Sequence, residues 1–316
     1  MKNMEGPSNS GKESRRDFLK KLSILGAGLV LAPEKVFSNS NKENFESNRI
    51  IESSEMLEME NDGNLPDGFK RTKINLEFND GRGKIEGAGS MFMFDNDKGK
   101  AEFISKKTHP DLFVGGIDFS KVENKYRLDG NSPALIVAGA YYSPNTRQVE
   151  GIALEDGVMV GEDIPKAGSN GLLVIENGEP HIEFINQIPD LDSYLNKLKS
   201  KKADVFQQTS YIRPGGTFSS RKDMKWELRF FVEGEYNGQI KKGVLNFSID
   251  MTYTEAVEAM NKMTGFKIQK AIGLDTGDMS EGYFYEKNGK KNLMIDEDSG
   301  THRDEYTNVL VLYSKK

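Results

Sequence analysis

The sequence has 316 residues, of which 36% are hydrophobic and 29% charged, with a formal net charge of −6 and no cysteine. The missing cysteines exclude disulfides, thiolate catalysis and cysteine-ligated metals, and with three histidines a histidine-rich metal site is not expected. The acidic balance, without a Lys/Arg cluster that has interleaved aromatics, argues against nucleic-acid binding. The length fits two domains, or one large α+β domain after a leader.

The N-terminus contains the most specific motif of the chain. Residues 14–20 read SRRDFLK and precede an apolar run, LSILGAGLVLA, at 22–32. This run is too short for a permanent membrane span but has the size of a signal h-region. The pair Arg15 and Arg16 resembles a twin-arginine export signal, which its receptor reads as an address. We therefore expect a signal peptide at 1–38 and a protein exported to the periplasm or outside the cell. The alternative is an amphipathic or buried helix.

The next segment, 39–68, has the composition of a linker. It is polar and acidic, and its few apolar residues cannot pack a core. We predict a disordered linker at 39–68 and one folded domain at 69–316. Its fold class is α+β, a β-rich single domain of mixed sheet with a few short helices. Apolar runs predict strands at 73–78, 90–94, 101–104, 112–119, 134–138, 226–232, 244–249 and 309–313.

Two hairpins and one helix are predicted in the middle of this domain. Asp156-Gly157 and Asn177-Gly178 lie between apolar runs, and such pairs are the strongest short-range hairpin signals. Residues 191–201 predict a helix whose basic C-terminal end matches the helix dipole. Residues 206–218 are expected to form a loop, in which Arg213 before Pro-Gly-Gly presents a guanidinium to an anion.

The buried strand at 134–138 leads into a run of small and aromatic residues. Gly139 and Ala140 let the backbone approach another element or a ligand. Tyr141 and Tyr142 provide flat surfaces with polar tips that suit sugar rings. The alternative is a core strand with ordinary tyrosines under a turn, and the pattern alone favours that alternative.

The segment 251–285 combines a capped helix with an acidic loop. Thr252 and Glu255 fit a capping box, and Gly265 is well placed to end the helix. A short apolar strand then leads into Asp275. A carboxylate at the end of a strand is a candidate site, but on spacing alone Asp275 and its neighbours also fit a turn.

The order and spacing of these motifs resemble the phosphodiester glycosidase domain family, the N-acetylglucosamine-1-phosphodiester α-N-acetylglucosaminidase-like proteins. In that family a buried strand enters an Asn-Gly-Gly-Phe-Phe turn and then an Asp-Gly hairpin. Later motifs are a Leu-Thr-Leu-x-Glu-Leu-Ala helix start, an Ala-Leu-Asn-Leu-Asp-Gly-Gly-Gly-Ser loop and a closing Arg…Asn-Ala-Leu strand. The matching segments here are 138–142, 156–157, 251–256, 271–278 and 303–310, within a resemblance that extends over residues 112 to 313.

The resemblance implies an exported hydrolase that cleaves a sugar-1-phosphodiester or related glycosidic bond in envelope or extracellular glycans. Asp275 is the expected catalytic anchor, with Asp278 or Glu281 as the second of the two carboxylates that glycosidases commonly use. The residues expected to bind the sugar or its anion are Gly139, Tyr141, Tyr142, Arg213, Arg221, Lys225, Gly277 and Asn308.

The sequence departs from the family pattern at several positions. Ala138 replaces the asparagine of Asn-Gly-Gly. The family's strand arginine falls on Lys225, unless Arg221 or Arg229 takes its place in space. Asp278 brings a side chain and a negative charge into a loop where the family has glycines, whose backbone N–H groups can close around a phosphate. These departures leave an alternative function, a catalytically degenerate glycan-binding or envelope-associated module on the same scaffold.

Neither the residues nor the resemblance implies a cofactor or assigns a metal site. Asp275, Asp278 and Glu281 are hard oxygen donors of the kind that binds Ca²⁺, but they lack EF-hand spacing. The expected partners are a glycan or sugar-phosphate substrate and the twin-arginine translocase, with no nucleic acid and no permanent membrane span.

Overall fold

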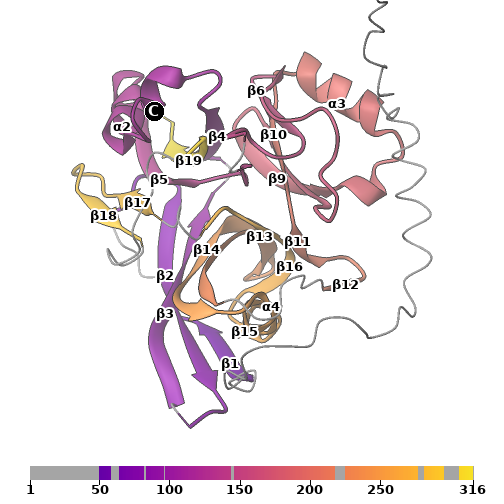
Figure 1. Cartoon of the computed structure of the whole chain (residues 1–316). Coiled ribbons are helices and arrows are strands. Elements are labelled where there is room, and N and C mark those ends of the chain that lie inside the picture. Colours follow the sequence, from indigo (N-terminus) through magenta and orange to yellow (C-terminus); the bar gives the residue numbers. More distant parts are fainter. Residues whose placement is uncertain are drawn as a thin grey trace, which may run out of the picture. The chain divides into compact units, whose positions relative to one another are not determined.

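The computed structural model describes most of the chain beyond residue 49. The described ranges are 50–57, 64–81, 83–95, 97–143, 146–217, 225–276, 281–294 and 306–315. They belong to one compact unit, Asn48–Lys316, which is β-rich and contains three short α-helices in these ranges (Figure 1). None of the helices in the described ranges has the length and apolar character needed to cross a membrane. The predicted signal, with Arg15 and Arg16, lies outside the described residues.

The largest sheet has nine strands and curls on itself (Figure 1). Neighbouring strands are antiparallel, except that the last two are parallel, so the sheet is mixed. The last strand of the sheet continues through a turn at Gly265 (φ 85°) into the strand that is third from the opposite end. This short connection brings the two ends of the sheet close together, so the sheet curls. In spatial order the strands are β12 (Gly216–Thr217), β11 (Ser210–Arg213), β16 (Lys267–Gly273), β13 (Trp226–Tyr236), β14 (Gln239–Met251), β3 (Gly83–Phe94), β2 (Phe69–Phe78), β1 (Ile51–Met56) and β15 (Met263–Thr264).

Helix α4 (Tyr253–Asn261) packs its apolar face on the core inside this curl (Figure 1). The predicted capping box is confirmed, because Thr252 Oγ1 accepts from the Glu255 N–H at 3.1 Å and Glu255 Oε2 accepts from the Thr252 N–H at 2.8 Å. The prediction for Gly265 is wrong. The helix ends at Asn261, and Gly265 instead turns β15 into β16.

The second sheet contains both predicted hairpins, which are confirmed. Asp156-Gly157 and Asn177-Gly178 have positive φ at both positions, as a tight two-residue hairpin turn requires. Helix α3 (Leu191–Ser200), also predicted, covers the outer face of this sheet through an apolar cluster. The strand order is β7 (Val158–Met159), β6 (Ala153–Glu155), β10 (Asp204–Gln208), β8 (Gly171–Glu176) and β9 (Glu179–Phe184).

The third sheet is antiparallel, and helix α2 (Phe119–Leu128) packs on one of its faces. Its central strand is buried on both sides, as its continuous apolar run predicts. Leu135 and Val137 face the core shared by the three sheets, whereas Ile136 and Ala138 face α2. The strand order is β18 (Lys291–Leu293), β17 (Gly282–Tyr285), β5 (Ser132–Ala138), β19 (Asn308–Ser314) and β4 (Gly99–Ser105).

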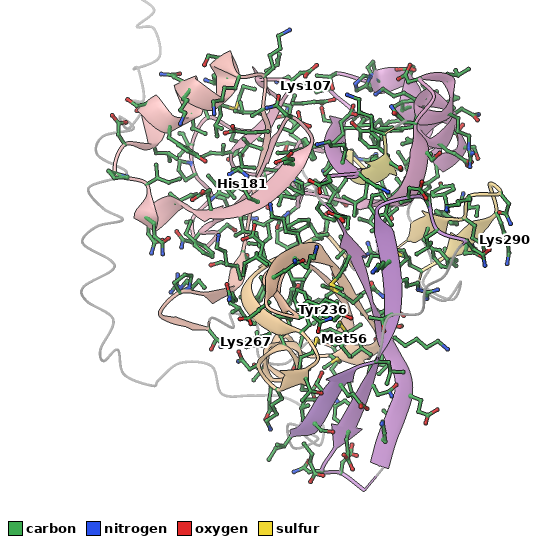
Figure 2. All side chains as sticks on the ribbon, turned by 180° about the vertical axis from the view of Figure 1, so that it is seen from behind. Met56, Lys107, His181, Tyr236, Lys267 and Lys290 are labelled. Carbon is green, nitrogen blue, oxygen red and sulfur yellow. The ribbon has the colours of Figure 1, made fainter. Side chains whose placement is uncertain are left out.

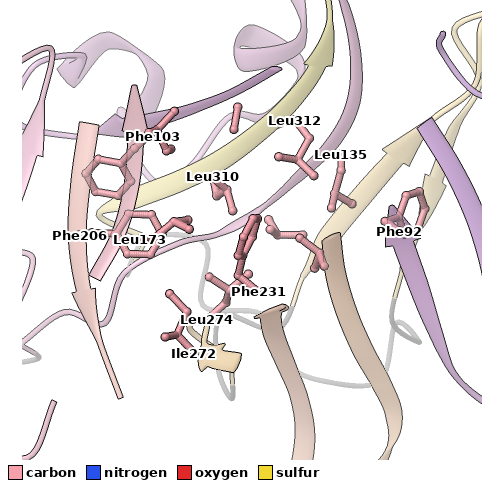
Figure 3. Close-up of a cluster of buried hydrophobic side chains, with 14 of the residues drawn as sticks. Phe92, Phe103, Leu135, Leu173, Phe206, Phe231, Ile272, Leu274, Leu310 and Leu312 are labelled. Atoms are coloured by element: carbon pink, nitrogen blue, oxygen red, sulfur yellow. The ribbon is translucent and has the colours of Figure 1, made fainter. Parts of the chain in front are cut away.

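The shared core joins the three sheets (Figure 3). The large sheet contributes Phe231, the second sheet Phe206, and the third sheet Leu310, and all three side chains are completely buried. Phe206 stacks in a tilted contact on Phe103 of β4, with ring centroids 4.9 Å apart. Removal of this much apolar surface from water is the main force that holds the sheets together.

Two carboxylates of the second sheet also bond to β4, at what we call the β4 edge. Asp204 Oδ2 accepts from the Phe103 N–H and Glu155 Oε2 from the Ser105 N–H, both at 3.0 Å. The Ala101 N–H donates to the Gly178 carbonyl at 2.8 Å. Every second N–H of an edge strand points outward, so these acceptors satisfy donors that strand pairing leaves free.

The structure differs from the sequence predictions in two segments of the middle region. The predicted strand at 112–119 is wrong, because Gly115 and Gly116 adopt positive φ and Asp118 caps α2, accepting from two backbone N–H groups at 3.1 Å. The predicted loop at 206–218 is also wrong, since it contains β11 and β12 and part of β10. Gln208 and Ser210 are polar but buried in paired strands, so side-chain polarity concealed the strands.

The compact unit begins earlier than the predicted domain boundary at residue 69. Within the predicted linker, Ile51–Met56 forms β1, which pairs with β2 and, in parallel, with β15. Ile51, Ser54 and Met56 are buried while the residues between them face solvent. The local composition is too polar to predict this strand, because its stability comes from partners distant in the sequence.

Candidate functional site

The turn after β5 is fixed by Asn308, which is buried at the start of β19. The Asn308 side chain accepts from the Ala140 N–H at 2.6 Å and donates to the Ala140 carbonyl at 3.0 Å. Gly139 has no room for a side chain, because its Cβ atom would lie 2.9 Å from Oδ1 of Asn308. Two residues expected to bind substrate, Gly139 and Asn308, are therefore in contact with each other and make the turn rigid.

Asp275 lies two residues after the end of β16 and is held against this turn. Its N–H donates to the Gly139 carbonyl at 3.0 Å, and Gln208 Nε2 donates to the same carbonyl at 3.2 Å. Asp275 Oδ1 accepts from the Thr276 N–H at 3.0 Å, which is the local turn geometry that the sequence also allows. The residue is only 7% exposed. A buried carboxylate is thus fixed where β5 and β16 meet.

Arg229 lies in β13 next to Asp275 and is almost completely buried. Its Nε donates to Oδ1 of Asn246 at 3.3 Å, and a Cβ atom on Gly282 of β17 would lie 3.2 Å from its Nη2. Burial lowers the pKa of Arg229 to about 10, whereas nearby acidic groups, Asp275 among them, act in the opposite direction. The guanidinium is therefore charged at neutral pH, and it lies close to Gly282, the residue after Glu281, and within electrostatic reach of Asp275.

Glu281 directly precedes β17 and is 4% exposed. Tyr283 donates its hydroxyl hydrogen to Glu281 Oε1, and the Tyr306 hydroxyl donates to the Glu281 carbonyl at 2.8 Å. Burial raises the pKa of Tyr306 well above its usual range. Arg229 opposes this rise, and the charges of Glu281 and Asp275 add to it. The two carboxylates and the guanidinium therefore act on one buried hydroxyl.

Tyr141 packs against the last residue of β16. Its hydroxyl would lie 2.8 Å from a Cβ atom on Gly273, so glycine is needed there for this approach. Burial raises the pKa of Tyr141 well above its usual range, and Tyr211, Tyr253 and Asp275 add to the rise. The rings of Tyr211 and Tyr253 are stacked, with centroids 4.9 Å apart. Tyr141 is thus brought to the Asp275 side of the turn, with its hydroxyl buried and the residue as a whole partly exposed.

The remaining predicted site residues are placed as follows. Tyr142 is partly exposed, forms an isolated bridge with Val149 and packs on the core under α2. Arg213 lies in the β11–β12 hairpin, where its side chain forms no hydrogen bond or ion pair with the described residues. Lys225 is an exposed residue directly before β13. Arg221, Gly277 and Asp278 lie outside the described residues.

Sequence reasoning left Arg229 as an alternative to Lys225 and did not identify Gln208. Gln208 is completely buried, and its Oε1 atom has no hydrogen-bond partner in the part of the chain that the structure describes. The sequence signal for Arg229 is a charged residue between Leu228 and Phe230 in an apolar strand. Such a residue must be buried, and a buried charge requires a partner.

Among the described residues, no group of three or more His, Asp or Glu side chains is arranged to hold a metal ion. Asp278, one of the three oxygen donors considered for Ca²⁺, lies outside these ranges. The Ca²⁺ site therefore stays a prediction.

Comparison with solved structures gives distant likenesses, two of which follow. No family model and no curated sequence matches the chain. The catalytic domain of zebrafish N-acetylglucosamine-1-phosphodiester α-N-acetylglucosaminidase, auto-inhibited by its pro-peptide, is similar at a TM-score of 0.46 and 12% identity, over 82% of this chain and 87% of that one. A hypothetical protein from Synechocystis is similar at a TM-score of 0.45 and 10% identity, over 78% of this chain and 62% of that one. Both TM-scores are below 0.5, so we draw no activity from them.

Proposed function

We propose that this protein is an exported hydrolase of the phosphodiester glycosidase type, which cleaves a sugar-1-phosphodiester or related glycosidic bond in envelope or extracellular glycans. One observation carries the proposal. Asp275 and Glu281, two buried carboxylates at the ends of neighbouring segments, share their surroundings with the buried guanidinium of Arg229. The motif resemblance found in the sequence supports the same activity.

The proposed chemistry uses the two carboxylates in different roles. Asp275 acts as nucleophile or base, because the Gly139 turn fixes its backbone. Glu281 acts as the acid that protonates the leaving oxygen, with Asp278 as the other candidate for this role. Glu281 Oε1 accepts from the Tyr283 hydroxyl, which orients the carboxyl group. Arg229 offsets the negative charge of a phosphodiester and of the carboxylates.

In this proposal the sugar lies against Tyr141 and Tyr142, which are both partly exposed residues. Arg213, whose side chain is unengaged in the described residues, is the proposed contact for an anionic group, together with Arg221 and Lys225. Gly139 and Gly277 contribute close backbone approach. Asn308 acts by holding the turn, because its amide is engaged with Ala140.

The second candidate function is a glycan-binding module without activity, and a specific observation favours it. Ala138 stands where the resembling family has asparagine, and it is buried in β5 opposite Val309. A methyl group at this position offers no hydrogen bond to a substrate. On this alternative the same side chains bind sugar, but no bond is broken.

The proposed export follows from the sequence alone. The Arg15-Arg16 pair before an apolar run is the motif that the twin-arginine translocase reads, and the proposed location is the periplasm or the extracellular space.

Turnover and sugar binding, measured on the same variants, distinguish the hydrolase from the glycan-binding module. The full chain is assayed with chromogenic glycosides and with sugar-1-phosphodiesters. We expect turnover, and Asp275→Asn and Glu281→Gln each lower kcat by about 10²- to 10⁴-fold, the usual contribution of a carboxylate acting as acid or base. Glu235→Gln, an exposed carboxylate in the same strand as Arg229, is the matched control and keeps full turnover.

Thermal unfolding of each variant verifies the fold. Full turnover by folded Asp275→Asn contradicts the assigned role. No turnover on any donor, combined with sugar binding in calorimetry that survives Asp275→Asn, replaces the hydrolase with the binding module.

A further inference from the structure

A cavity of about 260 Å³ lies in the large sheet, apart from the residues assigned to the proposed site. It forms where the start of β2, the end of β3 and the tip of the β13–β14 hairpin meet. Its lining consists of Gly68, Phe69, Lys70, Met93, Phe94, Asp95, Lys98, Tyr236 and Lys241. Tyr236, the last residue of β13, is partly buried and packs against the apolar side chains inside the curled sheet (Figure 2).

The walls of this cavity are fixed by backbone hydrogen bonds. The Asp95 N–H donates to the Gly68 carbonyl at 2.7 Å, and the Lys98 and Gly99 N–H groups donate to the Asp95 carbonyl at 3.1 and 2.7 Å. Gly68 has φ 85°, and a Cβ atom there would lie 2.6 Å from Cβ of Lys98. The turn that closes the cavity therefore exists before any ligand arrives, so binding costs little ordering.

The charge around the cavity is strongly unbalanced. Lys70, Lys98 and Lys241 line it, and in the described part of the chain no carboxylate lies within ion-pair distance of these three ammonium groups. Other lysines in the same region are paired, for example Lys100 with Glu179 at 3.3 Å. The carboxylate of the lining, Asp95, is exposed. Three lysines line the cavity with one carboxylate, and Asp67 is close enough to Lys98 for a Coulombic interaction. The excess of positive charge that remains in the lining favours an anion.

The rest of the lining is apolar and sets the kind of anion. Phe69, Met93, Phe94 and the ring of Tyr236 provide most of the wall. The volume is just below the range of about 300–1,000 Å³ for pockets that hold drug-sized ligands, so the occupant is no larger than one sugar unit. An inorganic ion alone would leave the apolar wall in contact with water.

We propose that this cavity binds a small organic anion, a single ring that carries one phosphate or carboxylate group. The anionic group pairs with Lys98 and Lys241 at the mouth, with Lys70 adding to the field. The ring lies against Tyr236 and Met93. The site is independent of the proposed hydrolase, because it uses none of that site's residues.

Binding to the full chain is measured by isothermal titration calorimetry with four probes: glucose 1-phosphate, glucuronate, glucose and inorganic phosphate. We expect glucose 1-phosphate or glucuronate to bind, and whichever binds more tightly identifies the anionic group. Affinity falls on going from about 50 to about 500 mM NaCl, because salt screens exposed charges. Equal affinity for glucose, or for inorganic phosphate, overturns the proposal, as does the absence of binding by both organic anions.

Variants test which residues form the site. Lys98→Glu combined with Lys241→Glu weakens binding by about a hundredfold, since each of the two lost charged contacts is worth about one factor of ten. Tyr236→Ala weakens binding, whereas Tyr236→Phe retains it because the ring supplies the contact. Lys73→Glu is the matched control, an exposed lysine of β2 outside the lining, and leaves affinity unchanged. Unchanged affinity in the folded double variant contradicts the assignment.

Discussion

Two regions of this molecule contain buried carboxylates, and their surroundings differ in kind. Near the end of β16, Asp275 and Glu281 lie beside a buried arginine. At the β4 edge, Glu155 and Asp204 are surrounded by N–H and O–H donors, with the partly exposed His109 at 3.2 Å from Glu155.

The comparison shows what a buried carboxylate does when its partner changes. At the β4 edge burial dominates, so the pKa of Asp204 rises to about 7 and that of Glu155 also rises. Hydrogen bonds from backbone N–H groups offset only part of this rise. Next to Arg229 a fixed positive charge is present, and burial acts on the arginine itself. The first arrangement joins strands, and the second keeps opposite charges together in the protein interior.

The largest expected effect tests the arginine. Arg229→Met removes the cation and leaves the acidic groups around it uncompensated, so we expect a loss of about 3–5 kcal/mol in the free energy of unfolding. Urea titration of the full chain measures it. The control Lys73→Met removes an exposed cation and changes stability by less than about 0.5 kcal/mol. A loss below about 1 kcal/mol for Arg229→Met would show that the carboxylates do not depend on it.

A smaller effect is expected at the β4 edge, in the way that the free energy of unfolding changes with pH. The pKa of Asp204 is about 7 in the folded chain against an ordinary value of 3.8, so the folded state holds this proton more tightly. The stability that comes from the protonated Asp204 is complete below pH 4 and is lost as pH rises through 7. Between these limits the free energy of unfolding falls by at most about 1.4 kcal/mol per pH unit. Urea titrations between these limits measure the slope. Asp204→Asn should flatten it, and the remaining slope of the same sign comes from Glu155.

The smallest effect concerns His109, whose side chain is 34% exposed beside Glu155. Glu155 also accepts from Ser105 and Thr108, so we expect His109→Gln to change the free energy of unfolding by less than about 1 kcal/mol. Ser105→Ala serves as the comparison, since it removes a buried hydroxyl that bonds to the same carboxylate. If His109→Gln were the more damaging of the two, the β4 edge would depend on the contact between His109 and Glu155 more than on the Ser105 hydroxyl.

The fold was predictable from sequence where the determinants are local. The capping box at Thr252, the turns at Gly157 and Gly178, and the continuous apolar run of β5 specify their elements within a few residues. The strands β1, β10 and β11 were not predictable in this way, because buried polar residues such as Ser54 and Gln208 are stabilised by partners far along the chain.

The candidate site was predictable in part for the same reason. A strand followed by Asp275 is a local pattern, and so is the Gly139 turn. That Asp275 bonds to Gly139, and that Arg229 rather than Lys225 is the buried cation, depends on the order of strands in the sheets. Sequence spacing carries no information on that order. The proposed lysine cavity was missed because its residues come from parts that are distant in the sequence: the start of β2, the end of β3 with the turn after it, and the β13–β14 hairpin.

The pairing of β1 has a consequence for the order in which the chain folds. During synthesis β1 leaves the ribosome before any other described strand, yet its Ile51 N–H donates to Glu258, 207 positions later, and its parallel neighbour β15 follows α4. The curled sheet can therefore close only when most of the domain has been made. Contacts of such long sequence separation slow folding. A twin-arginine translocase, the exporter proposed for this chain, would receive the domain after that closure.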